Sequence, residues 1–433
     1  MEIAIPIILL FGIFFLLMAL GVPITYSIAT ASLISALSLL PFNASLSVIT
    51  QKLTFGLDAF ALLAIPFFVL AGNLMNSGGI ARRLINLALS MVGWLPGSLA
   101  LCNILANALF GAISGSAVAS AAAVGGIMGP MQEKEKYDKG FSAAVNIASA
   151  PTGLLIPPSN VLIVYSLASG GTSIASLFVA GYIPGILMAL GLMIASLLIV
   201  LIKKYPINRV PFSITLFLKS LLDAIPSLLL IIIVVGGIIK GVYTATEASA
   251  IAVVYTLILS LVFYREIKVS DLPRIFLESV VTATSVLLLV GASLGMSWVM
   301  TNADIPFLIA DALESIKHNR LLLLLMMNVI LLIIGTFMDI TPAILIFTPI
   351  FLPFANELGV DPIQFGIIMV FNLSIGLCTP PVGSILFVGA SVAGIKLEKI
   401  IGPLIPLYLV TIIVLTLVII FPELSLYLTR FIS

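Results

Sequence analysis

Charged side chains are scarce in this sequence of 433 residues. Asp, Glu, Lys and Arg make up 9% of it, whereas soluble domains carry about 25%. Hydrophobic residues make up 61%. So few charges exclude a soluble domain of any size, and the formal net charge of +1 gives no reason to expect nucleic acid as a partner. The composition is that of an integral membrane protein.

The scarcity of histidine and cysteine excludes several kinds of enzyme. A single histidine, His318, rules out an HExxH zinc site and argues against a Ser/His pair. Cys102 and Cys378 stand apart in apolar runs, where packing explains them better than a disulfide or a metal. An intramembrane aspartyl protease needs two membrane aspartates, and Asp339 has no partner. No GxxxxGK[ST] loop is present. We therefore expect no enzymatic activity.

Apolar runs near the ~20 residues that a spanning helix needs recur from end to end. The fold class expected is an all-α polytopic membrane protein. Two further apolar pairs, 94–130 and 320–355, each fold back on a short polar tip and are expected to be re-entrant hairpins. The predicted spans are 3–21, 22–41, 59–76, 140–168, 175–202, 227–245, 246–264, 275–300, 363–390 and 403–425.

The distribution of basic residues predicts the orientation. With the N-terminus outside, 14 of the 19 Lys and Arg residues fall on inner segments. Because inner segments of membrane proteins are enriched in Lys and Arg, both termini are expected outside. The first apolar run lacks a basic leader and a small-residue cleavage site, so we expect it to be a retained span.

The chain resembles itself at an offset near 223 residues. A shift of 223 places "GLLIPP" (153–158) on "GLCTPP" (376–381), and a shift of 224 places the tip of the first hairpin on that of the second. Each half, 1–202 and 227–433, then has five crossings and one hairpin, joined by an amphipathic segment at 203–226. Five is odd, so the second half enters the membrane from the opposite face. Inverted repeats of this kind are typical of secondary transporters.

Prolines interrupt one predicted span in each half. Each break contains two prolines, which lack the N–H that a helix needs and leave carbonyl oxygens unpaired. These are Pro157 and Pro158 in the first half and Pro380 and Pro381 in the second. Unpaired backbone at membrane depth is tolerated only where protein or a water-filled cavity satisfies it. The alternative is a kink without function. The matched pair favours function, because each break is accompanied by a hairpin.

Hydroxyl and carbonyl oxygens near the breaks suit Na⁺, a hard cation. Asp339 is one of very few acidic residues inside an apolar run, although it is also placed to cap the second helix of its hairpin. The predicted ligands of a first Na⁺ site are Ser114, Ser116, Ser149, Thr152 and Gly153. Those of a second site are Gly335, Asp339, Thr379, Pro380 and Val382.

An anionic substrate is expected where free helix N-terminal amides follow the breaks. The predicted substrate-binding residues are Ser116, Ser159, Asn160, Gly383 and Ser384.

Four segments resemble the large membrane subunit of tripartite ATP-independent periplasmic (TRAP) transporters: "GSAVASAAAVGGIMGPM", "AAVNIASAPTGLLIPPSN", "GTFMDITPAILIFTPIFLP" and "GLCTPPVGSILFVGAS". The resemblance covers essentially the whole chain. It implies an elevator mechanism in the bacterial inner membrane and Na⁺-coupled uptake of an organic acid, such as a C4-dicarboxylate or a sialic acid. It also implies two partners, a periplasmic substrate-binding protein and a small four-helix membrane subunit on a separate chain. The alternative is a stand-alone Na⁺-coupled dicarboxylate carrier, whose Ser-Asn-Thr signatures are missing at both tips.

Overall fold

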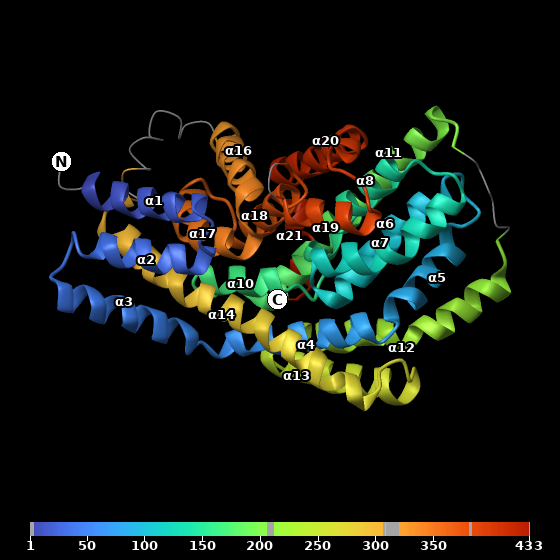
Figure 1. The fold of residues 1–433 in the computed structure, drawn as a ribbon, viewed down its shortest axis with the longest axis horizontal. Helices are drawn as coiled ribbons and strands as arrows, with labels where there is room; N and C mark the ends of the chain where they lie inside the picture. Colours follow the sequence, from blue (N-terminus) through green and yellow to red (C-terminus); the bar gives the residue numbers. More distant parts are fainter. Residues whose placement is uncertain (1–3, 206–211, 306–307, 309–319, 381–382, 433) are drawn as a thin grey trace.

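The chain is all-helical in the computed structural model, which describes residues 4–205, 212–305, 308, 320–380 and 383–432 (Figure 1). Eight described helices are long and apolar enough to cross a membrane. A bent pair, Lys139–Leu155 with Asn160–Ala168, would make a ninth span.

One group of helices, the long-helix bundle, packs mainly within itself. In Figure 1 α3, α4, α12 and α13 lie along its lower side, and α14 contacts α2, α3 and α4. Its members are α1 (Ala4–Ala19), α2 (Ile24–Ala36), α3 (Phe42–Leu57), η1 and α4 (Phe60–Leu63 and Ala64–Ser77), α12 (Ile214–Ile239), α13 (Ala245–Ile258) with its π-helical end η2 (Leu259–Phe263), and η3 and α14 (Val269–Asp271 and Leu272–Asn302).

The second group, the hairpin bundle, contains both helical hairpins and both broken spans. The hairpins are α6 (Ser98–Ser114) with α7 (Ala117–Lys134), and α16 (Arg320–Phe337) with α17 (Ile340–Glu357). The broken spans are α8 (Lys139–Ser149), α9 (Thr152–Leu155) and α10 (Asn160–Ala168), then α18 (Pro362–Gly376) and α19 (Ser384–Ala393). The long helices α11 (Ile174–Ile202) and α20 (Glu398–Ile420) pack against them, followed by α21 (Glu423–Leu426) and η4 (Leu428–Phe431). Corresponding helices of the two halves begin roughly 223 residues apart.

Helix α5 (Ile80–Val92) connects the two bundles, because it packs on α12 on one side and on α6 on the other. Its apolar residues fall on one face and its two arginines on the other, as in a helix half-exposed to a polar phase. Neither this helix nor α3 falls within a predicted span.

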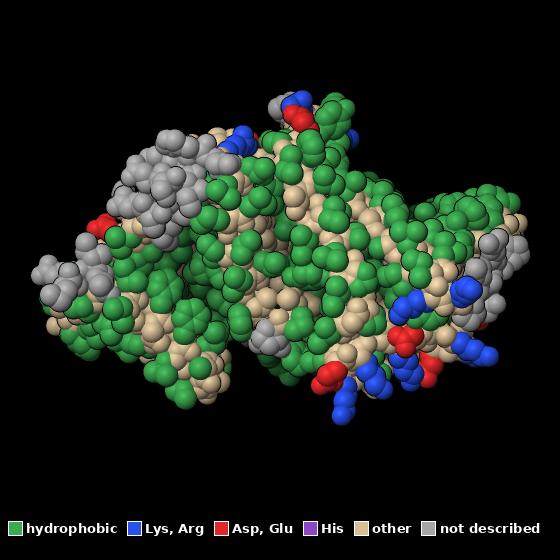
Figure 2. All heavy atoms as spheres, turned by 90° about the horizontal axis from the view of Figure 1, so that it is seen from above, with side chains coloured by type: hydrophobic (Ala, Val, Ile, Leu, Met, Phe, Trp, Pro, Cys, Tyr) green, Lys and Arg blue, Asp and Glu red, His purple; other side chains and the backbone are tan. Residues whose placement is uncertain are grey.

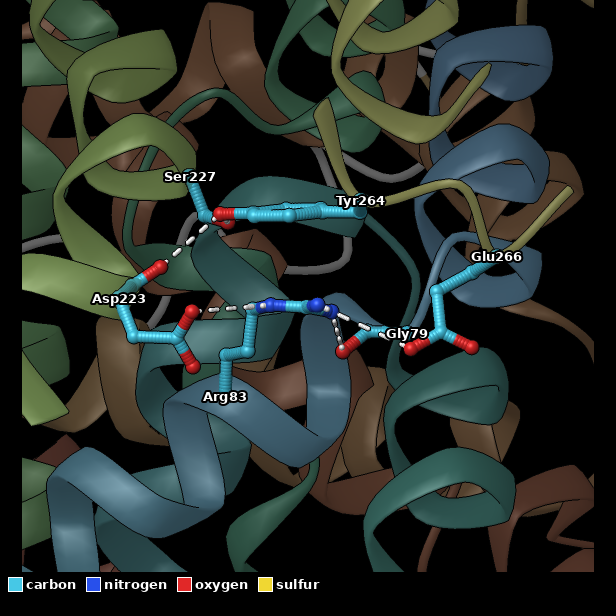
Figure 3. A network of polar contacts seen from close by, with 6 residues as sticks. All are labelled: Gly79, Arg83, Asp223, Ser227, Tyr264 and Glu266. Atoms are coloured by element: carbon cyan, nitrogen blue, oxygen red, sulfur yellow. Dashed lines mark hydrogen bonds and ion pairs between the residues drawn. The ribbon is translucent and has the colours of Figure 1, made fainter. Parts of the chain in front are cut away.

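An arginine fixes the start of α5 to the long-helix bundle (Figure 3). The guanidinium of Arg83 stacks on the Tyr264 ring, with its central carbon 3.6 Å from the ring centroid. Its nitrogens lie 3.4 Å from a carboxylate oxygen of Asp223 and 3.7 Å from one of Glu266. It also donates to the Gly79 carbonyl at 3.0 Å. The elbow between α4 and α5 is therefore held to α12 and to the turn after η2.

Three predicted span limits need correction. The predicted spans 3–21 and 22–41 contain α1 and α2, helices of 16 and 13 residues. At about 1.5 Å per residue both are shorter than the ~30 Å hydrocarbon core. The predicted start at 227 lies inside α12, which runs without a break from Ile214 to Ile239. The amphipathic residues from 214 onward that precede 227 therefore belong to the same continuous helix as the apolar residues that follow.

The surface agrees with a membrane location. Figure 2 shows a wide hydrophobic area, with most of the charged side chains of that view gathered at one edge and a smaller group opposite. Large apolar side chains of α11, α12 and α14 are also exposed, among them Ile202, Leu222 and Leu277. In water such a patch would be unfavourable, whereas lipid tails accept it.

Candidate functional site

The tip of the first hairpin rests on the break of the first broken span. Gly115 has φ +63°, which lets the chain reverse between α6 and α7. A Cβ on Gly115 would lie 3.2 Å from the Pro158 carbonyl oxygen and 3.5 Å from the Asn160 amide nitrogen. The axis of the chain bends by 53° at this break. Pro157 and Pro158 remove the N–H groups that would pair with the carbonyls of Gly153 and Leu154 in a continuous helix.

Both hairpin tips reach one cavity of about 190 Å³. Ser114 and Ser116 enter it from the first tip, Asp339 from the second, and Asn160 from the start of α10. The long-helix bundle closes the opposite side with Asn73 of α4 and Thr282 of α14. Of the described residues that line this cavity, Asp339 alone is charged.

Asp339 both caps a helix and lines the cavity. It precedes α17 as its N-cap, and its carboxylate accepts a hydrogen bond of 2.7 Å from the Ile340 N–H. Asp339 as a whole residue is exposed, and it lines the cavity. Ser116 likewise caps α7 by accepting from the Ala119 N–H at 3.3 Å. Capping occupies only part of the acceptor capacity of these oxygens.

The other residues predicted for the first Na⁺ site lie deeper in the hairpin bundle and do not line the cavity. The Ser149 hydroxyl donates to the Val145 carbonyl at 2.7 Å and lies 2.8 Å from the Asn107 amide nitrogen. The Thr152 hydroxyl donates to the Ser149 carbonyl at 2.6 Å. Both side chains therefore bind groups of their own bundle, although a hydroxyl that donates its hydrogen keeps acceptor capacity on its oxygen.

The residues predicted for the second Na⁺ site lie in different parts of the hairpin bundle. The Thr379 hydroxyl donates to the Ile375 carbonyl and lies 3.1 Å from the Tyr408 hydroxyl, on the α20 side. Gly335 packs against Gly376, and Pro380 is exposed. Val382 and Pro381 lie outside the described residues. Asp339 is thus the one member of this predicted set that lines the 190 Å³ cavity among the residues that the structure describes.

Two serines share an unusual position at the starts of the second halves of the broken spans. Ser159 directly precedes α10, and Ser384 begins α19. Their hydroxyl oxygens are buried, and within the described part of the chain neither has a hydrogen-bond partner. Gly383, next to Ser384, is buried, and its N–H donates to the Thr379 carbonyl at 3.1 Å.

Two residues that line the cavity, Asn73 and Thr282, are not among the site residues predicted from the sequence. Asn73 is an amide inside an apolar helix, a signal that was available, and it donates to the Ser279 hydroxyl at 2.8 Å. Thr282 gave no such signal, since a threonine is common in membrane helices. Only the packing of α4 and α14 against the hairpin tips makes these residues part of the site.

The comparisons with known proteins agree on one family. The family model described as "Tripartite ATP-independent periplasmic transporter, DctM component" matches residues 11–424. The C4-dicarboxylate TRAP transporter large permease protein DctM of Pseudomonas aeruginosa is 40% identical, over 92% of this chain and 93% of the relative. The sialic acid TRAP transporter large permease protein SiaM of Vibrio cholerae is 38% identical, over 97% of each chain.

A solved structure supports the fold alone. The YdaH transporter of Alcanivorax borkumensis superposes with a TM-score of 0.61 over 87% of this chain and 88% of that one, at 13% sequence identity. The architecture is therefore one that a membrane transporter is known to adopt.

Proposed function

Because the chain belongs to the family of the DctM component of tripartite ATP-independent periplasmic transporters, we propose that it takes up a small organic acid together with Na⁺. The observation that carries the proposal is the meeting of both hairpin tips, one broken span and a single carboxylate at one cavity. Oxygen ligands and a negative charge suit Na⁺, and the helix N-termini suit an anion.

The proposed substrate class is inferred from the substrates for which the relatives are named. One is named for C4-dicarboxylates and the other for sialic acid, at similar identity to this chain. Both substrates carry carboxylates, so a carboxylate is the group that we propose the cavity accepts.

Two partners are part of the proposal. Among the described residues lining the cavity there is no arginine or lysine that would grip an organic anion tightly. The chain by itself would therefore bind its substrate weakly. A periplasmic substrate-binding protein would capture the substrate first and deliver it. A small four-helix membrane subunit, on a separate chain, would complete the transporter on the exposed apolar surface of the long-helix bundle.

The movement we propose is an elevator. The hairpin bundle holds the cavity residues Ser114, Ser116 and Asp339, while the long-helix bundle contributes only one wall. Sliding the hairpin bundle past that wall in the bacterial inner membrane would carry the site from one face to the other. Both chain termini would then lie on the periplasmic face, as the distribution of basic residues predicts.

The test is uptake into proteoliposomes with an inward Na⁺ gradient. We expect transport only when this chain, the small subunit and a loaded binding protein are all present, and loss of it when K⁺ or choline replaces Na⁺. Undiminished uptake with a proton gradient alone would refute Na⁺ coupling. Robust uptake by the chain alone would favour the stand-alone carrier instead.

A further inference from the structure

A cavity of about 890 Å³ lies where helix α5 meets α12 and the outer ends of the first hairpin. In Figure 1, α5 lies between α12 and this hairpin, and it packs on both. On α12 the lining residues are Leu216, Lys219, Ser220 and Asp223, spaced i, i+3, i+4 and i+7, so the helix turns one face to the cavity. None of the described lining residues also lines the 190 Å³ cavity. This is therefore a separate site between the two bundles.

Two lysines line this cavity, one from each bundle. Lys134 ends α7 in the hairpin bundle, and Lys219 lies in the second turn of α12 in the long-helix bundle. Within the described part of the chain neither lysine has a carboxylate partner. Asp223 also lines the cavity, but the Arg83 guanidinium lies 3.4 Å from one of its carboxylate oxygens and offsets its charge. Two ammonium groups at one cavity favour a phosphate, whose oxygens accept charge-assisted hydrogen bonds.

A carboxylate beside the lysines narrows the choice of headgroup. Glu135 follows Lys134 in the chain and lines the same cavity. Its charge would repel a ligand that is only negative and attract one that also carries a positive group. A phosphoethanolamine headgroup carries both, because its phosphate suits the lysines and its primary ammonium has three N–H donors for carboxylate oxygens. The charges of the lining therefore match a zwitterion better than an anion.

The rest of the lining is suited to an acyl chain. Leu89, Leu99, Met131 and Leu216 line the cavity, and Leu216 is 46% exposed. Trp94, which is 48% exposed, directly follows a lining residue of α5, and tryptophan is typical of the boundary between headgroups and acyl chains. A volume of about 890 Å³ is also far more than a free phosphate fills. The ligand expected is therefore amphipathic, with a charged end at the lysines and an apolar end along the leucines.

We propose that the 890 Å³ cavity binds a membrane phospholipid with a phosphoethanolamine headgroup. Its phosphate lies between Lys134 and Lys219, its ammonium group faces Glu135, and one acyl chain lies along the leucines of the lining. Basic pockets between membrane helices are suited to lipid headgroups in this way. Because one lysine belongs to each bundle, the bound lipid links the two bundles. The proposal depends neither on the substrate nor on the coupling ion.

Lipid titration tests the two lysines. The full chain is purified in detergent, and binding of phosphatidylethanolamine is measured by native mass spectrometry. A variant with Lys134→Gln and Lys219→Gln is compared with one carrying Lys136→Gln and Lys203→Gln, two exposed lysines that do not line the cavity. We expect the first pair to raise the Kd by about ten-fold or more and the second pair to change it little. Equal Kd values for the two variants would overturn the proposal.

The headgroup is tested with lipids that share the same acyl chains. We expect the wild-type chain to bind phosphatidylethanolamine about five-fold more tightly than phosphatidylglycerol, which is only negative, and phosphatidylcholine, whose ammonium has no N–H to donate. Glu135→Gln should remove the advantage over phosphatidylcholine. Glu133→Gln, at an exposed carboxylate that does not line the cavity, should keep it. Binding of phosphatidylglycerol as tight as that of phosphatidylethanolamine would overturn the proposal.

Two further comparisons separate a lipid from a free phosphate compound. Ser220→Trp places a large side chain in the cavity and should weaken lipid binding by about five-fold, whereas Leu218→Trp, at an exposed position of the same helix outside the lining, should not. Soluble glycerophosphoethanolamine and inorganic phosphate should displace the lipid only at concentrations at least about a hundred times its own. Displacement at similar concentrations would show a site for free phosphate compounds and refute the lipid.

Discussion

Gly111 of the first hairpin lies directly against Gly153 of the first broken span, so closely that a Cβ on Gly111 would stand 2.6 Å from the Gly153 Cα. The second half repeats the contact. A Cβ on Gly335 would stand 3.2 Å from the Gly376 Cα. In each half, an amide side chain also bridges the hairpin to the broken span, as Asn372 does by donating to Asn328 at 2.7 Å. Each hairpin is thus fixed to its own break by backbone contact, which no larger residue allows.

The glycine contact predicts a steric effect on stability. Gly111→Ala should destabilise the protein by about 1–3 kcal/mol, because neighbouring backbone cannot yield to the added methyl group. Thermal unfolding in detergent measures it. Gly126→Ala is the control, since its Cβ meets nothing and alanine favours the helix. Equal Tm values for the two variants would contradict the close contact.

Asp339 predicts an effect on cation dependence. Asp339→Asn removes the one charge from the described lining of the 190 Å³ cavity and should raise the Na⁺ concentration for half-maximal uptake by about ten-fold or more. Asp58→Asn and Asp304→Asn should have little effect, because neither residue lines that cavity. If Asp339→Asn transports normally at matched protein levels, its role is confined to capping α17.

The proline break predicts a loss of transport without a loss of folding. Replacing Pro157 and Pro158 by alanine restores two N–H donors and allows α9 and α10 to join, which withdraws the carbonyls of Gly153 and Leu154. Uptake should fall to background while monodisperse protein is still recovered. Replacing Pro403 and Pro406, which lie inside the continuous helix α20, is the matched control. Normal uptake in the Pro157/Pro158 variant would show that the break is only a kink.

The Arg83 contacts predict a specific role for one of two adjacent arginines. Arg83→Gln removes the stacking on Tyr264 and the contacts with Asp223 and Glu266, and should lower stability by about 1–2 kcal/mol. Arg82→Gln, at the exposed neighbouring position, should be close to neutral. Arg83→Lys should recover only part of the stability, because lysine lacks the planar group that stacks. A Tm for Arg83→Gln equal to that of Arg82→Gln would refute this anchor.

The hydropathy pattern of the sequence and the positions of its prolines and glycines determined many features of this fold. Apolar runs located the hairpins and most long helices, because lipid and a buried core both demand uninterrupted hydrophobicity. Pro157 and Pro158 located the first break, because proline cannot continue the helical hydrogen bonds. The hairpin tips followed from short polar stretches such as Gly115 and Ser116, which suit a turn at membrane depth.

Tertiary structure decided the rest. Helices α3 and α5 are too polar to register as spans, and α12 shows that an amphipathic start and an apolar end can form one continuous helix. Asn73 and Thr282 join the site only through the packing of α4 and α14 on the tips. Ser149 and Thr152, promising in the sequence, bind groups of their own bundle. A hydroxyl's partners depend on which helices lie within about 3 Å, and local sequence does not encode that distance.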